Sequence, residues 1–204
     1  MERARISGLV ALTALMAMAF VGAASAMAEP TALCKADENP CSEANLIASV
    51  HETSVGKAKV LTSLGTVECN ALFASTSVGA PGAPQILKGN FTYSNCELGG
   101  ASCTATGENG PAELKVLREG HETAKVTYEY LVHLVCYKTI DCSYTGASLE
   151  GTAKGPLLSA QESDNGEVAL SGQSLTKEAG GFLCPKTAKL DITTTPLTAT
   201  YISS

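Results

Sequence analysis

The amino-acid sequence predicts an all-β fold, a disulfide-braced β-sandwich or Greek-key barrel, on three observations. After its N-terminal part the chain consists of short runs rich in Val, Thr, Leu, Tyr and Ser, in which apolar and polar residues alternate. Clusters of Gly, Pro and Asn separate these runs at regular intervals, as turns do in all-β domains. Eight cysteines, an even number, can brace such a fold with disulfides.

Residues 1–28 have the three-part pattern of a secretory signal peptide. Arg3 and Arg5 precede an apolar run from Leu9 to Val21, and small residues follow this run. The alternative is a permanent membrane anchor, but no basic cluster follows that would stop transfer. We therefore expect an exported protein, extracellular or associated with the cell envelope, with no membrane segment once the signal peptide is cleaved.

Cleavage of the signal peptide fits the small-x-small rule after Ala26 or after Ala28, and we favour Ala28. The remaining residues 29–204 suffice for a single all-β domain of ordinary size. The whole chain carries a formal net charge of -6, and its lysines are spread singly. Nucleic acids and anionic lipid surfaces need clustered cations, so we expect neither as a partner.

The mature chain opens with TALCKADENPC, in which Cys34 and Cys41 bracket Asp37, Glu38 and Asn39. We favour a disulfide that closes a polar surface loop. A lipid anchor is disfavoured because a leucine precedes the first cysteine, and a redox pair because six residues separate the two. Calcium would find oxygen ligands here, but the spacing and the turn glycine of an EF-hand loop are absent.

The next segments predict one short helix and then strands. SEANLIASV favours a short helix with a serine as N-cap, and a strand is the alternative. In GTVECN the alternation directs Val67 and Cys69 inward. In ILKGNFTYSNC the same period places Leu87, Phe91 and Tyr93 on one face.

The longest predicted strand is AKVTYEYLVHLVCY, and its inward face carries Val126, Tyr128, Tyr130, Val132, Leu134 and Cys136. From Leu131 onward both faces are apolar, which predicts that the strand enters a two-sided interior. Its alternating tyrosines favour core or sheet surface over a binding platform. TAKLDITTT shows the cleanest alternation, with Ala188, Leu190 and Ile192 on the buried face.

We expect all eight cysteines to form disulfides, and closeness in sequence favours particular pairs. These are Cys34 with Cys41, Cys96 with Cys103, Cys136 with Cys142 and, over a long range, Cys69 with Cys184. Alternatively, the cysteines of the local pairs could form disulfides with cysteines on neighbouring strands.

The sequence predicts no catalytic residue, no metal site and no cofactor. His51, His121 and His133 each lack a second histidine three to five residues away, as a zinc motif would require. We expect the His-Glu pairs at 51–52 and 121–122 to be solvated and His133 to be satisfied in or near the core. The chain has no G-x-S-x-G turn and no phosphate loop.

Four segments of the chain carry a resemblance: LCKADENPC, LTSLGTVEC, FTYSNC and GGFLCPKTAKLD. Together they resemble a group of exported, cysteine-paired, β-rich proteins of high-GC Gram-positive bacteria, over most of the mature chain. The resemblance implies a secreted all-β domain and assigns no catalytic residue, because no function is established for the group. An aromatic residue near Leu190 and a short Pro-aromatic ending, which the group would lead us to expect, are missing here.

These observations favour a secreted, non-enzymatic protein that recognises an extracellular or cell-envelope partner or serves as a structural component. One alternative is a secreted hydrolase whose site gathers histidines and dispersed acids, such as Glu129 or Glu150, in a cleft. Another is an inhibitor of exported proteases that presents a disulfide-braced loop, either residues 34–41 or residues 96–103.

Overall fold

The computed structural model describes residues 29–107, 112–156 and 165–204, so the predicted signal peptide and its cleavage sites lie outside the described residues. The strands are β1 (Ala32–Cys34), β2 (His51–Ser54), β3 (Ala58–Thr62), β4 (Gly65–Val78), β5 (Gln85–Leu98), β6 (Ala101–Gly107), β7 (Ala112–Gly120), β8 (Thr123–Cys136), β9 (Ile140–Lys154), β10 (Glu167–Gly180), β11 (Thr187–Pro196) and β12 (Tyr201–Ser203). Of the predicted helix, one 3-10 turn forms, η1 (Glu43–Asn45). Within the described ranges no helix combines the length and apolar character needed to cross a membrane.

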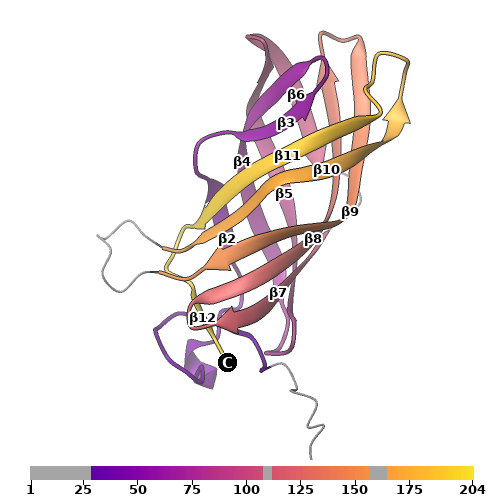
Figure 1. The fold of residues 1–204 in the computed structure, drawn as a ribbon. Coiled ribbons are helices and arrows are strands. Elements are labelled where there is room, and N and C mark those ends of the chain that lie inside the picture. The colour runs from indigo at the N-terminus through magenta and orange to yellow at the C-terminus, as the bar shows by residue number, and fades with distance from the viewer. Residues whose placement is uncertain (1–28, 108–111, 157–164) are drawn as a thin grey trace, which may run out of the picture.

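The wall of the fold is a closed antiparallel barrel with eight strand positions (Figure 1). β4, β5, β8, β9, β10 and β11 each fill one position. β2 and β3 share the position between β4 and β11, and β6 and β7 share the position between β5 and β8. Consecutive positions of the wall pair along the chain, and β11 returns to β2 and β3 to close the wall.

The predicted all-β, disulfide-braced fold is confirmed, and the connectivity is simpler than a Greek key. Neighbours in the wall are neighbours in sequence, so the barrel is of the up-and-down type. Closure pairs the strand edges with one another, which removes the exposed edges that an open sheet would present. Eight strands enclose a space that side chains can nearly fill.

The predicted inward faces are confirmed. All six predicted inward residues of β8 are at most 4% exposed, and so are Val67 and Cys69 of β4. The predicted two-sided interior beyond Leu131 is wrong, because Leu131, His133 and Val135 are half-buried on the outer wall. A closed barrel has a single interior, so an apolar outer face in one strand does not make a second core.

The N-terminal and C-terminal segments close one end of the barrel. β1 pairs with β12, and Leu33 and Ile202 from this small sheet are buried in the same core as the wall residues. Figure 1 shows β12, the C-terminus and η1 together below the wall strands. The two ends of the described chain therefore act as a single cap on the barrel.

All eight cysteines form disulfides, as predicted, but only one of the four predicted pairs is correct. Cys34 bonds to Cys41 as expected. The other pairs are Cys69–Cys96, Cys103–Cys136 and Cys142–Cys184, in place of Cys96–Cys103, Cys136–Cys142 and Cys69–Cys184. The inhibitor alternative assumed that a disulfide between Cys96 and Cys103 closes the hairpin at 96–103. The structure has no such disulfide, because these two cysteines bond to Cys69 and Cys136.

Strand register explains why closeness in sequence predicted the wrong disulfide pairs. Cys103 lies opposite both Cys96 on β5 and Cys136 on β8, so two partners are within reach, and it bonds to Cys136. Cys136 and Cys142 flank the β8–β9 turn, but Cys136 opposes Ile140 rather than Cys142. Directly opposite residues in antiparallel strands approach closely enough for a disulfide, and residues out of register do not.

We predict that peptide mapping without reduction will recover these four pairs. Replacing Cys103 and Cys136 by alanine should lower the free energy of unfolding by about 3–4 kcal/mol, because their sequence separation is 33. The same change at Cys34 and Cys41, whose separation is 7, should cost about 2.5 kcal/mol. Chemical denaturation of both double variants measures the difference, and equal losses would contradict the assignment.

Candidate functional site

Among the described residues, the position shared by β6 and β7 leaves part of β5 and β8 without a strand partner, and we call this part of the wall the window. β5 pairs with β7 as far as Gly89 and with β6 from Thr92 onward. On the opposite side, β8 pairs with β7 up to Tyr128 and with β6 from Val132. Between these limits the described strands of the shared position offer β5 and β8 no backbone partner. The window therefore follows from two short strands filling a position whose neighbours are long.

A cavity of about 490 Å³ lies at this window and reaches from the barrel interior to the outer wall. The size is typical of sites for small molecules. Its lining on the inner side includes Phe91, Tyr93, Tyr128 and Tyr130. Its outer lining includes Lys88, Asn90, Glu113, Glu129, Leu131, Thr145, Ala147 and Glu178. We call this cavity the wall pocket.

The aromatic rings of the wall pocket form a cluster around Phe91. The Phe91 ring lies edge-on to Tyr128 at 5.5 Å and is stacked with Tyr93 at 6.1 Å between ring centroids. Behind it, Phe73 packs at 5.1 Å, in space that a side chain on Gly89 would occupy. Such contacts fix the rings in place, so the floor of the pocket is preformed.

The tyrosine hydroxyls are the polar atoms of this floor. The Tyr93 and Tyr130 hydroxyl oxygens are 2.7 Å apart and share one hydrogen bond. Tyr128 is only 3% exposed, and its hydroxyl has no hydrogen-bond partner among the described residues. Burial raises the pKa of all three phenols, so they remain neutral hydroxyls at physiological pH.

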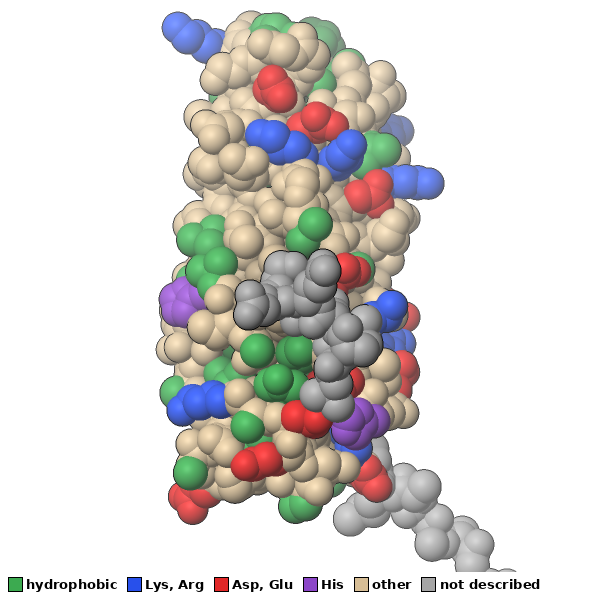
Figure 2. Space-filling model, turned by 90° about the vertical axis from the view of Figure 1, so that its left-hand side faces the viewer, with side chains coloured by type: hydrophobic (Ala, Val, Ile, Leu, Met, Phe, Trp, Pro, Cys, Tyr) green, Lys and Arg blue, Asp and Glu red, His purple; other side chains and the backbone are tan. Residues whose placement is uncertain are grey.

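The charges around the pocket mouth are mainly negative. Glu113, Glu129 and Glu178 line it together with one lysine, Lys88. Glu113 is paired with Lys115 at 3.4 Å, whereas in the described part of the chain Glu129 and Glu178 form no ion pair. Figure 2 shows one face of the molecule, on which acidic and basic side chains are interspersed.

Glu52 lies in the barrel interior, where the sequence predicts a solvated residue. Its side chain faces inward from β2, is 4% exposed, and accepts a hydrogen bond from the Thr194 hydroxyl at 2.5 Å. It borders two small cavities of about 10 and 30 Å³, and Tyr128 borders the first of them. Burial raises the pKa of the Glu52 carboxyl, and the hydrogen bond from Thr194 partly opposes this.

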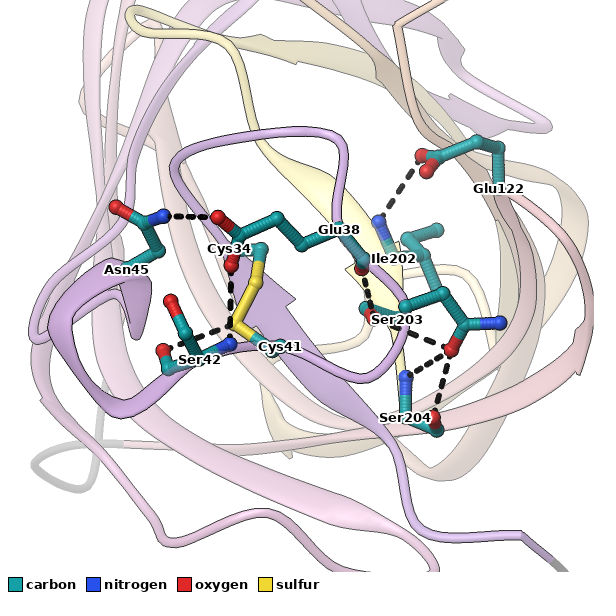
Figure 3. Close-up of a disulfide and its surroundings, with 10 residues drawn as sticks. Cys34, Glu38, Cys41, Ser42, Asn45, Glu122, Ile202, Ser203 and Ser204 are labelled. Carbon is teal, nitrogen blue, oxygen red and sulfur yellow. Dashed lines mark hydrogen bonds between the residues drawn. A yellow bond between two sulfur atoms is a disulfide. The ribbon is translucent and has the colours of Figure 1, made fainter.

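The loop closed by the Cys34–Cys41 disulfide is a structural staple (Figure 3). The Glu38 carboxylate accepts hydrogen bonds from the Ser42 amide at 3.0 Å and from the Asn45 side chain at 2.6 Å. The Asn39 side-chain oxygen accepts from the Ser204 hydroxyl at 2.6 Å. These oxygens bind groups of the chain itself.

The structure does bring Asp37 next to His121 and Glu122, a juxtaposition that the sequence did not reveal. One ligand atom from each lies within 4.8 Å of the others. Asp37 faces His121 at 3.7 Å, and Glu122 accepts a hydrogen bond from the Ile202 amide at 3.0 Å. Because Asp37 pairs with His121 and Glu122 bonds to β12, the cluster ties the disulfide loop and the β7–β8 turn into the cap.

The remaining candidate residues lie apart on the outer wall. His133 pairs with Asp141 at 2.7 Å between Nε2 and Oδ1, on the outward face of β8 and β9 rather than in the core. Glu150 pairs with Lys125 at 2.8 Å, and His51 is exposed at the edge of β2. Of the residues named for the hydrolase alternative, only Glu129 reaches the wall pocket.

Comparison with known proteins adds no further constraint on the site: no family model, curated protein or solved structure matches this chain.

We predict that the buried phenols will resist ionisation. About one pH unit above the ordinary pKa of 10.0, Tyr93, Tyr128 and Tyr130 should still be protonated, because burial raises the pKa of each. Tyrosinate absorbance, followed against pH alongside circular dichroism, measures this. Ionisation of all six tyrosines while the fold is intact would contradict the buried cluster.

We also predict that Glu52 makes the free energy of unfolding depend on pH. Its folded pKa is raised above the ordinary 4.5, so its favourable contribution is complete below that value and is lost as pH rises through the folded pKa. Glu52→Gln should therefore unfold with a weaker pH dependence than the wild type as the pH rises above 4.5. Denaturant titrations across this range test it. Glu97→Gln, an exposed control, should keep the wild-type profile.

Proposed function

We propose that this protein is an exported, non-enzymatic binding protein that recognises a small ligand, or the exposed group of a larger envelope component, in the wall pocket. The observation that carries the proposal is the preformed aromatic floor beneath an interruption of an otherwise closed wall. An uninterrupted wall of this size would leave the rings inaccessible.

Two further observations support the proposal. Four disulfides indicate an oxidising environment, in agreement with export by the predicted signal peptide. The Tyr128 hydroxyl lines the pocket and forms no hydrogen bond with the described residues, so it is free to exchange one with water or a ligand. A rigid site with unmet hydrogen-bonding capacity is suited to recognition.

The proposal is tested by blocking the pocket from outside. Ala147 is exposed and lines the pocket, so Ala147→Trp should place an indole in its mouth without disturbing the core. Thr152→Trp, at an exposed position on the same strand, is the matched control. Saturation-transfer NMR with a mixed set of amines, sugars, carboxylic acids and short peptides should find ligands that bind the wild type and the control and are lost in Ala147→Trp.

Two outcomes would count against a binding pocket at this place. The first is that no compound of the set binds the wild type. The second is that every compound that binds does so equally in Ala147→Trp and in Thr152→Trp, which would place the binding elsewhere on the surface. Circular dichroism and the unfolding midpoint of both variants show that the fold is retained.

A further inference from the structure

We infer that the ligand of the wall pocket is an organic cation, an alkylammonium group carried on a short aliphatic chain. This inference rests on the proposed binding function and adds the chemical class of the ligand. It follows from the combination of ring faces, unpaired carboxylates and phenolic oxygens around one cavity.

The ring faces provide the first contact. Phe91 and Tyr93 are only partly buried and line the pocket, while the other rings of the cluster hold them in place. An aromatic face carries negative charge density and attracts a cation that lies over it, most strongly where water is displaced. A neutral apolar ligand would gain burial from the same rings but not this attraction.

The carboxylates at the pocket mouth favour a positively charged ligand. Glu129 and Glu178 line the mouth and, within the described ranges, form no ion pair, so their charges are available to a ligand. Among the described residues of the lining, Lys88 is the single cation. An anionic ligand would meet net repulsion at this mouth, and a cationic ligand net attraction.

The phenolic oxygens complete the site for an ammonium group that still carries hydrogen. The Tyr128 hydroxyl lacks a partner among the described residues, and its oxygen can accept an N–H bond. Asn90 adds an amide oxygen at the outer lining. A fully methylated ammonium group would rely on the ring faces and the carboxylates alone.

The test compares three probes that share a shape and differ in charge. Choline is the cation; its uncharged carbon isostere, with a tert-butyl group in place of trimethylammonium, is the neutral probe; and tert-butylacetate is the anion. Isothermal titration calorimetry at low ionic strength should give choline an affinity roughly three to thirty times that of the neutral isostere. The anion should bind more weakly than either.

Charge variants show which residues are responsible. Glu129→Gln combined with Glu178→Gln should weaken choline binding roughly three- to tenfold and leave the neutral isostere unchanged. Glu97→Gln combined with Glu119→Gln changes the net charge equally at exposed positions outside the wall pocket and should leave both unchanged. Lys88→Gln should strengthen choline binding, a gain that a merely structural role for these residues would not produce.

The outcomes separate the two proposals. If the neutral isostere or the anion binds as tightly as choline, and Ala147→Trp abolishes that binding, the cation inference is overturned and the binding function stands. If the affinity for choline is the same in the carboxylate and lysine variants as in the wild type, the cation inference is overturned in the same way. If none of the three probes binds, the cation inference fails, and the wider compound set decides the binding function independently.

Discussion

The structure depends on closing an antiparallel wall around one interior. Closure requires that each strand have a hydrogen-bonded neighbour on both sides, and the chain meets this with consecutive hairpins and a final pairing of β11 with β2 and β3. Because the barrel has eight positions, its interior is narrow and inward side chains nearly fill it. The burial pattern of each wall strand follows from this closure.

The disulfides reinforce that closure across the strands. Cys69, Cys96, Cys103, Cys136 and Cys142 lie on adjacent strands of the wall, and each bonds to a neighbouring strand or to the loop after β10. Cross-links between strands oppose separation of the wall, whereas links between the two cysteines that flank a single turn would have braced only that turn. The fourth disulfide braces the cap, where the loop that it closes is held by the C-terminal residues.

The wall pocket exists because closure is incomplete at one point. Two strands fill the position between β5 and β8, and in the described part of the chain neither pairs with β5 and β8 beside the aromatic cluster. The same narrow interior that packs the rings also raises the pKa of the phenols and of Glu52, since water is excluded from them. The narrow interior of the barrel is thus the cause both of the ring packing and of the raised pKa values.

The sequence by itself determined which residues face inward, because strand alternation is a local property with period two. It predicted Leu190 and Ile192 of β11 and all six inward residues of β8 in this way. It also predicted that all the cysteines pair, from their even number and from the predicted signal peptide. Only the tertiary structure decided which strands meet. It placed Glu52 in the interior, chose among cysteines that have two neighbours, and set the window beside Phe91, because strand register and closure depend on contacts between residues far apart in the chain.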